Sequence, residues 1–366
     1  MPAGMTPQRL DVSEGASGNG SPIPQRILII QLRRIGDVIF TLPVIKVLRE
    51  NFPQAQIDFL VEKPADQLVR LDPYVSETLA YDRDRPVHWL REIRSRRYDL
   101  VLDFLANGRT LLLTLCSGAR RKAAFTGPLS RSLVYNHLAR ATPHTYLVEQ
   151  KLDILRSLSL KAGSWGWDIR LPAAETKWAK DFLKEKGVGS ARVLVAMAPA
   201  SRRETRRWLP ERFAEVAQSL LGKGRDVILL WGPGEREYIE DIARRTGGSG
   251  PGRMVIPPDT PLLRLAALIR SSSLALTVEN GPKNLAVALG VPTVNIAGPN
   301  NPESFNPLSD PSHVVVRDET LGCLGCELNA CPTRHECMEN ISSDKVLLEI
   351  ERLLCRPAAA PAAQGA

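Results

Sequence analysis

Short apolar runs alternate with amphipathic segments along almost the whole chain. Residues 26–31 (RILIIQ), 56–61 (QIDFLV) and 99–104 (DLVLDF) have the length and apolar composition of strands buried in a parallel sheet. The segments between such runs carry apolar residues at three- and four-residue spacing, which is typical of helices packed on a sheet. This alternation, with short turns, predicts an α/β fold built on parallel sheets with right-handed crossovers.

The same pattern continues beyond these runs and divides the chain into two α/β sets. In the first half we predict further strands at 78–81 and 119–126, and helices between Gly36 and Pro53 and at 89–97, 109–116 and 146–158. In the second half we predict strands at 192–197, 226–231, 254–256, 274–278 and 293–296, and helices at 177–186, 210–221, 236–245, 262–271, 282–289 and 342–353.

Two sets of this kind predict two doubly wound, Rossmann-like domains that face a cleft. The segment 162–172 has weak periodicity, so we place the domain boundary there. The predicted organisation is a disordered leader (1–24), an N-terminal domain (25–172), a C-terminal domain (173–355) that includes a cysteine cluster at 323–337, and a disordered tail (356–366).

The stretch 274–299 (LALTVENGPKNLAVALGVPTVNIAGP) contains the clearest candidate for a ligand site. A strand ends before Glu279, and Gly281-Pro282 opens a helix, because proline suits the first helical turn. The free N–H groups and positive dipole end of that helix would favour an anion such as a diphosphate. The alternative is an ordinary strand–helix corner without a ligand.

The amino-acid composition limits the kinds of molecule that the chain is expected to bind. The 366 residues carry a formal net charge of +8, which favours acidic partners, but aromatic residues make up only 5% and do not interleave with a basic stretch, so nucleic acid is disfavoured. The sequence shows neither an apolar run of membrane-spanning length nor a secretory h-region. We therefore expect a cytoplasmic protein in a reducing compartment.

Three motifs at predicted strand ends contain candidate catalytic or ligand-binding residues. Asp37 follows the first strand, where a carboxylate can act as a general base or merely cap a helix. Arg206 lies in an arginine-rich loop, 201–208, that suits phosphate oxygens or is a solvated basic loop. Glu235 opens a helix, where it can accept hydrogen bonds from a ribose diol or complement the helix dipole. The fingerprint G-x-G-x-x-G and the P-loop are both missing, which disfavours dinucleotide redox chemistry and P-loop phosphoryl transfer.

Four cysteines lie within 15 residues near the C-terminus, at Cys323, Cys326, Cys331 and Cys337. Four thiolates at this spacing can close a tetrahedral site, with zinc as the default metal and iron as an alternative. Such a site would be structural, since all four ligands come from the protein. Unligated thiols and paired disulfides are the other interpretations.

Three segments together resemble glycosyltransferase family 9, the ADP-heptose:lipopolysaccharide heptosyltransferases, over nearly all of 26–354. They are RILIIQLRRIGDVIFTLPVIKVLRENFP, RRETRRWLPERFAEVA and ENGPKNLAVALGVPTVNIAGPNNPESFNP, the last followed by the cysteine cluster. The resemblance implies a GT-B architecture of two Rossmann-like domains. It also implies an inverting transfer of heptose from ADP-heptose to a lipopolysaccharide inner-core acceptor, without a catalytic metal.

By the same resemblance, Asp37 matches the catalytic base and Arg206 stands where the family commonly has a phosphate-binding lysine. The implied donor-binding residues are Arg206, Glu235, Glu279, Asn280, Gly281, Pro282 and Asn284. On charge and placement we predict that Arg33, Arg34, Arg120 and Arg121 contact acceptor phosphates. An enzyme with such an acceptor would work at the inner face of the membrane, in peripheral contact with it.

The chain departs from the family at the donor motif. Where the family usually reads Asp-Ser/Thr-Gly-Pro-x-His, this chain has Glu279, Asn280, Gly281, Pro282, Lys283 and Asn284. Asn284 cannot carry the charge of a histidine. Three alternatives to heptose transfer therefore stay open: a transferase of the same family with another nucleotide sugar or a protein acceptor, a sugar-nucleotide epimerase, and a non-catalytic homologue.

Overall fold

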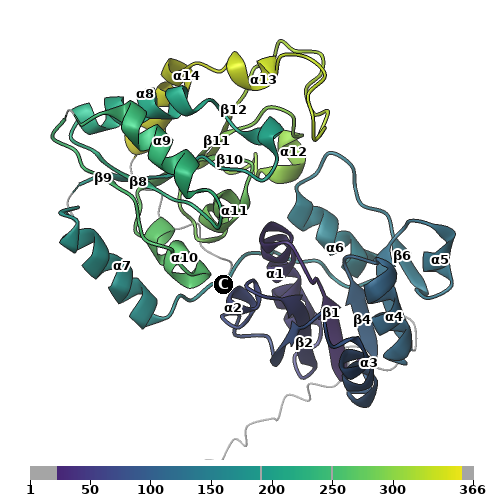
Figure 1. Cartoon of the computed structure of the whole chain (residues 1–366). Coiled ribbons are helices and arrows are strands. Elements are labelled where there is room, and N and C mark those ends of the chain that lie inside the picture. Colours follow the sequence, from purple (N-terminus) through teal and green to yellow (C-terminus); the bar gives the residue numbers. More distant parts are fainter. Residues whose placement is uncertain (1–22, 190–191, 249, 357–366) are drawn as a thin grey trace, which may run out of the picture.

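The chain folds into two lobes, each built around one parallel sheet (Figure 1). The computed structural model describes residues 23–189, 192–248 and 250–356. The predicted leader and tail therefore lie outside the described residues, except for Ile23, Pro24 and Arg356.

In the first lobe the strand order is β3-β2-β1-β4-β5-β6, and every neighbouring pair is parallel. The strands are β1 (Arg26–Ile30), β2 (Gln56–Glu62), β3 (Glu77–Tyr81), β4 (Leu100–Asp103), β5 (Arg121–Phe125) and β6 (His137–Ala139). The helices are α1 (Ile35–Asn51), α2 (Asp66–Val69), α3 (Pro86–Ser95), α4 (Gly108–Cys116), α5 (Leu129–Ser132) and α6 (Leu147–Ser157).

The second lobe repeats this plan with the order β12-β11-β10-β7-β8-β9. Its strands are β7 (Leu194–Ala198), β8 (Asp226–Leu229), β9 (Met254–Val255), β10 (Leu274–Val278), β11 (Thr293–Ile296) and β12 (His313–Val316). Its helices are α7 (Ala173–Glu185), the 3₁₀ turn η1 (Glu204–Arg206), α8 (Pro210–Gly222), α9 (Arg236–Thr246), α10 (Leu262–Arg270), α11 (Gly281–Ala288), α12 (Pro302–Phe305), α13 (Glu336–Glu339) and α14 (Ser343–Leu354).

The predicted α/β class and the two doubly wound sheets are confirmed. In each sheet the strand order reverses beside the first strand of the lobe, between β1 and β4 and between β7 and β10. Open α/β sheets bind their ligands outside the carboxyl ends of the strands at this point. Strands β1, β4, β7 and β10 are largely apolar and, apart from Arg26, buried, because helices cover both faces of each sheet.

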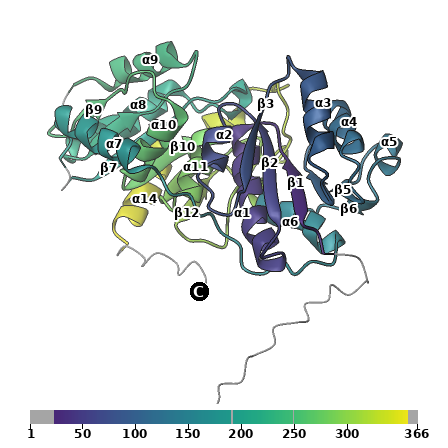
Figure 2. The same cartoon turned by 90° about the horizontal axis from the view of Figure 1, so that it is seen from below.

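Helices α1 and α11 join the two lobes (Figures 1 and 2). Ile39 of α1 belongs to the same apolar cluster as Leu285 of α11. The segment between α6 and α7 passes this junction, where the Trp167 indole N–H donates to the Ile39 carbonyl over 2.8 Å. Because α1 and α11 each follow the central strand of a switch point, their contact brings the two carboxyl edges together.

Candidate active site

The first lobe contributes Asp37 to this junction. Strand β1 ends at Ile30 and α1 begins at Ile35, which places Asp37 in the first helical turn. Its Oδ2 accepts from the Arg34 backbone N–H over 3.4 Å, while the side chain remains partly exposed. Asp37 can therefore cap the helix and still offer a carboxylate oxygen, since one oxygen is enough for the capping contact.

A buried lysine lies near Asp37. Lys151 of α6 is 9% exposed; its Nζ donates to Gln31 Oε1 over 3.1 Å and lies 5.0 Å from the centre of the Phe104 ring. Burial lowers its pKa to about 8, against the opposing effect of the Asp37 and Asp103 carboxylates. Gln31 follows β1 and Phe104 follows β4, so this ammonium lies at the switch point of the first sheet.

Sequence reasoning missed Lys151, although a signal was present. Val148, Lys151, Leu152 and Leu155 recur at three- and four-residue spacing, which puts the lysine on the apolar face of its helix. A charged residue on such a face is buried, and it needs polar partners from other elements.

The second lobe contributes the start of α11. Asn280 caps it: its Oδ1 accepts from the Lys283 N–H over 2.9 Å, and its Nδ2 donates to the carbonyls of Ala198 and Ala200 over 2.8 and 2.9 Å. These bonds tie α11 to the end of the central strand β7. Apart from its two chain neighbours and the backbone of its own helix, no atom of the described residues lies within 4 Å of the position that a Cβ on Gly281 would take, so the first turn of α11 is open there.

Arg206 lies beside this helix start, at the end of η1. Its guanidinium carbon is 5.6 Å from the centre of the Phe305 ring, and its Nε is buried without a hydrogen-bond partner among the described residues. Burial, followed by the charge of Arg203, lowers its pKa; Glu279 and Glu327 oppose the shift, and Arg34 adds to it. Three arginines from both lobes thus repel one another here, which favours an anion between them.

The two helix starts approach each other closely. A Cβ on Gly36 would stand 2.5 Å from Asn284 Nδ2, so only glycine leaves room for the amide in this arrangement. Asn284 is buried, and its Oδ1 has no hydrogen-bond partner in the described part of the chain. The start of α1, which includes Asp37, therefore lies close to the start of α11.

The other residues predicted for the donor site differ in their surroundings. Glu279 is 4% exposed and bonds to buried side chains of its own lobe. Pro282 occupies the first turn of α11. Glu235 lies at the carboxyl edge of β8, where its Oε2 accepts from the Gly232 N–H over 2.8 Å. The structure thus gathers these residues at one sheet edge.

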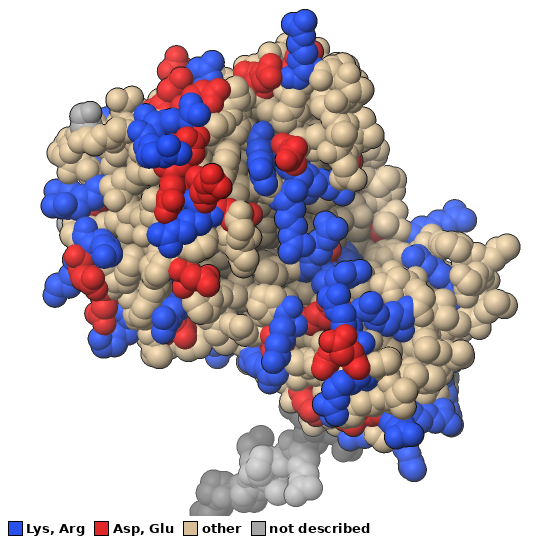
Figure 3. Space-filling view, viewed as in Figure 1, with Lys and Arg blue, Asp and Glu red and all other residues tan. Residues whose placement is uncertain are grey.

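The four arginines predicted for the acceptor do not lie together. Arg33 and Arg34 are exposed and come shortly before Asp37 in the chain. Figure 3 shows that Lys and Arg side chains gather near the boundary between the lobes. Arg120 and Arg121 lie at the opposite edge, since Arg121 pairs with Leu100 at the start of β4. The two pairs lie apart because the second pair precedes its strand and the first pair follows one, so that Arg120 and Arg121 as acceptor contacts stay a prediction.

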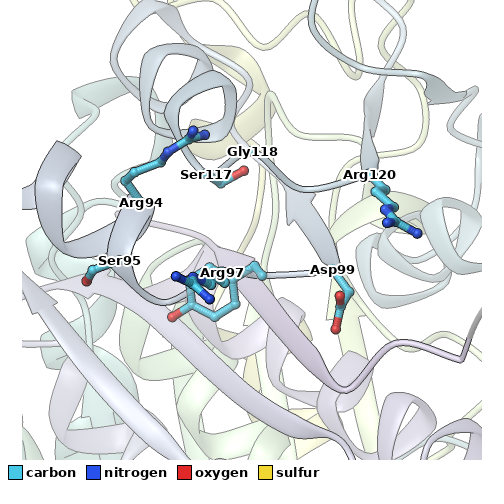
Figure 4. A pocket seen from close by; sticks show the side chains of 8 residues that line it. Arg94, Ser95, Arg97, Asp99, Ser117, Gly118 and Arg120 are labelled. Carbon is cyan, nitrogen blue, oxygen red and sulfur yellow. The ribbon is translucent and has the colours of Figure 1, made fainter.

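Arg120 instead lines a separate pocket at the amino ends of β4 and β5. Arg94 and Arg97 from the end of α3 and the turn after it surround the same pocket, with Asp99 between Arg97 and Arg120 (Figure 4). The length of a strand separates this pocket from Asp37, so it forms no part of the candidate site.

The cysteine cluster lies in the segment between β12 and α14. Cys323 and Cys326 are exposed, Cys331 is partly exposed and Cys337 is buried. Within the described ranges, no group of three or more His, Cys, Asp or Glu side chains is placed to hold a metal ion. Spacing alone does not bring the four thiols into a metal-binding arrangement, so the predicted zinc or iron site finds no support in this structure.

This cysteine-rich segment braces the arginine loop. Arg203 Nη1 donates to the Glu327 carbonyl over 3.1 Å, and Thr205 Oγ1 donates to the Leu328 carbonyl over 2.9 Å. Burial, followed by the charges of the other three cysteines, raises the pKa of Cys337 to about 11, which keeps this thiol protonated near neutral pH. The segment therefore holds the arginine loop through two backbone carbonyls and through the His335 side chain, whose Nε2 contacts the Thr205 carbonyl.

Comparison with known proteins identifies the family. The family model for glycosyltransferase family 9 (heptosyltransferase) matches residues 87–335, more than half of the chain. The chain belongs to glycosyltransferase family 9. It is 26% identical over 361 residues to lipopolysaccharide heptosyltransferase 3 of Escherichia coli (strain K12), covering 91% of this chain and 98% of that protein.

Solved structures of similar proteins share the fold of this family 9 member. A glycosyl transferase family 9 protein from Veillonella parvula has a TM-score of 0.79 at 22% identity, over 90% of this chain and 97% of that one. The E. coli ADP-heptose lps heptosyltransferase II has a TM-score of 0.75 at 21% identity, over 90% and 98%. The predicted GT-B architecture is thereby confirmed.

Proposed function

We propose that this family 9 glycosyltransferase moves a heptose from ADP-heptose to a lipopolysaccharide inner-core acceptor with inversion. Family membership and the heptosyltransferase relatives support this proposal. The observation that carries it is the junction itself, where the α1 start with Asp37 approaches the α11 start of the other lobe, and where Arg34 lies close enough to Arg206 to lower its pKa.

In the proposed mechanism, Asp37 takes the proton of the acceptor hydroxyl as that oxygen attacks the anomeric carbon of the heptose. The bond from that carbon to the diphosphate oxygen breaks in the same displacement, so the configuration inverts. Negative charge develops on the leaving ADP, and Arg206 and the free N–H groups at Gly281 stabilise it. Arg34 and Arg203 add positive charge near the same place.

We assign the donor site to the second lobe. Arg206 and the start of α11 would bind the diphosphate, and Glu235 the ribose. Asn280, Pro282 and Asn284 shape the pocket for the sugar; the buried Asn284 Oδ1, which has no hydrogen-bond partner within the described residues, is a candidate acceptor for a sugar hydroxyl. We place the domain boundary between 172 and 173, with the acceptor domain before it and the donor domain after it.

We assign the acceptor to the first lobe beside Asp37. Arg33 and Arg34 are exposed there and can bind phosphate groups on an inner-core oligosaccharide. We propose that the enzyme works in the cytoplasm, at the inner face of the membrane that carries this acceptor. Over the residues that the structure describes, helices that are both long and apolar enough to cross a bilayer are absent.

We propose that transfer needs no metal, since arginines and a helix start supply the positive charge at the diphosphate. A chelator should therefore leave the rate unchanged. A loss of activity in chelator that added Mg²⁺ or Mn²⁺ restores would contradict this part of the proposal.

The decisive experiment is a thermal-shift screen of nucleotide sugars followed by a transfer assay. Stabilisation by ADP-heptose above other nucleotide sugars, with ADP release only when a lipopolysaccharide-core acceptor is present, is the expected result. Selective stabilisation by a uridine or guanosine sugar would overturn the donor. Consumption of the sugar nucleotide without acceptor would indicate an epimerase, and binding without turnover a non-catalytic homologue.

A further inference from the structure

Lys283 is a fully buried cation next to the donor site. The side chain is 0% exposed, although it belongs to the first turn of α11. Its Nζ lies 3.2 Å from Glu279 Oε2 and donates to the Phe305 carbonyl. The ring of Phe40, from α1 of the other lobe, is centred 6.0 Å from the same nitrogen. The ammonium thus connects β10, α11 and α12 and reaches the junction of the lobes.

Both oxygens of the Glu279 carboxylate already have partners in the protein. While Oε2 pairs with Lys283, Oε1 accepts from Asn306 Nδ2 over 2.9 Å and from Asn295 Nδ2. With 4% of the residue exposed, little of this carboxylate is left for a ligand. A sugar hydroxyl that bonded to it would have to displace an amide or the ammonium.

Both partners of this pair hold the segment that carries Phe305. Lys283 binds the Phe305 carbonyl, and Glu279 binds the side chain of the next residue, Asn306. The Phe305 ring in turn packs under the guanidinium of Arg206 at 5.6 Å. Direct contacts therefore link the buried ion pair to Arg206, which we propose binds the diphosphate.

We infer that Glu279 and Lys283 are positioning residues, which form a buried brace that sets Phe305 and hence Arg206 for the nucleotide diphosphate. This inference rests on the proposed function for the identity of the nucleotide. It changes the role expected of Glu279, because the acid acts through Phe305 and Arg206 and does not contact the sugar. It also explains why the donor motif combines Lys283 with a glutamate, Glu279, where the family usually has the shorter aspartate. Each side chain neutralises the charge of the other.

The test uses the full chain with Lys283→Met, Glu279→Gln and the double variant. Lys283→Met leaves a buried carboxylate without its cation, whereas the double variant removes both charges and keeps a similar volume. Glu279→Gln is the milder change, because burial already lowers the pKa of Lys283 and the lysine can lose its proton. This variant keeps the experiment decisive if Lys283→Met does not fold.

Arg225→Met is the matched control. Arg225 forms a two-bond ion pair with Glu351, over 2.7 and 2.5 Å, at the amino end of β8 and away from the proposed donor site. This variant also breaks a close ion pair, so it should lower stability without changing nucleotide affinity or the exchange of residues 302–306.

Two measurements are made, the dissociation constants of ADP and ADP-heptose and amide hydrogen exchange over 302–306. We expect the single variants to weaken both ligands by the same factor, about tenfold for Lys283→Met, and to speed exchange over 302–306. The double variant leaves no buried charge unpaired, but it lacks the ammonium that donates to the Phe305 carbonyl, so exchange over 302–306 should stay faster and both ligands should bind more weakly than in the wild-type chain. Loss of ADP-heptose affinity alone would show direct sugar contact and overturn the brace.

Unchanged exchange and ADP affinity in Lys283→Met would overturn it as well. If the wild-type chain bound neither ADP nor ADP-heptose, the proposed function would fail, yet the exchange data would still decide whether the pair holds residues 302–306.

Discussion

Among the described residues, each lobe buries one lysine at the carboxyl edge of its sheet, and the two ammonium groups have very different partners. Lys283 has a carboxylate at 3.2 Å and a carbonyl as partners. Lys151 has one amide oxygen at 3.1 Å and an aromatic ring, and among the described residues it forms no ion pair within 4.0 Å. Asp37 and Asp103 act on it only from farther away.

This difference in partners indicates that the two sides of the junction have different roles. A buried charge with a complete set of partners fixes the surrounding segments, which suits a face that must hold a diphosphate in one geometry. A buried lysine without a close carboxylate leaves the neighbouring acid free for a ligand, although burial lowers the pKa of both lysines. The first lobe accordingly presents a partly exposed Asp37, while the acid of the second lobe, Glu279, is enclosed.

The sharpest way to test this division is Asp37→Asn. The amide keeps the size of the side chain but cannot take a proton, so kcat should fall by about 10²- to 10⁴-fold. ADP affinity should stay within about twofold, because Asp37 lies on the acceptor side. Steady-state kinetics and calorimetric titration with ADP check both parts; transfer at the wild-type rate would remove Asp37 from the role of base.

Lys151→Met tests the lysine that lacks a close carboxylate. The folded-state pKa of about 8 lies below the ordinary value of 10.5, so between these values the unfolded chain holds more protons. The free energy of unfolding should therefore rise with pH from about 8 to about 10.5, by at most about 3 kcal/mol. The variant should lack the part of this rise that Lys151 contributes; burial lowers the pKa of Lys283 too, so Lys283→Met should remove a contribution of its own. Urea unfolding across this range measures the slope, and a slope equal to the wild type's would contradict the assignment.

Arg206→Ala tests the charge that the brace positions. Loss of hydrogen bonds to a charged diphosphate should cost about 1.5–3 kcal/mol, which weakens ADP about ten- to hundredfold. Arg236→Ala is a suitable control, because Arg236 is exposed on α9 and pairs with Glu240. Equal ADP affinity of Arg206→Ala and the control, measured by titration, would place the diphosphate elsewhere.

Arg34→Ala should give the smallest effect. Arg34 is exposed, so its attraction for an anion is screened and should be worth less than about 1 kcal/mol. The deficit should be present at low ionic strength and vanish at about 1 M salt. A loss of ADP affinity that persists at high salt would indicate that Arg34 binds the nucleotide directly across the junction.

Much of the fold followed from the pattern of apolar runs, because a strand covered on both faces must be apolar along its length. The elements that the pattern missed are short or lie at an edge, namely α2, α5, α12, α13, β6 and β12. A four-residue helix such as α12 has no periodicity to detect. Its importance lies in Phe305, whose contact with Arg206 joins residues 99 positions apart.

The amino-acid sequence by itself determined the two-domain α/β class, the family and the placement of Asp37, Arg206 and the α11 start at strand ends. These follow from local order, because a residue that comes directly after a parallel strand lies at its carboxyl edge. The opposite placement of Arg120 and Arg121 follows the same rule, since they precede their strand.

Only the tertiary structure decided which polar side chains point inward. The i, i+4 spacing of Glu279 and Lys283 is compatible with an exposed ion pair as much as with a buried one. Their burial results from the contact of α11 with α1 and from the segment that returns through α12. Packing between distant elements sets desolvation, and desolvation sets whether a charge serves a ligand or the fold.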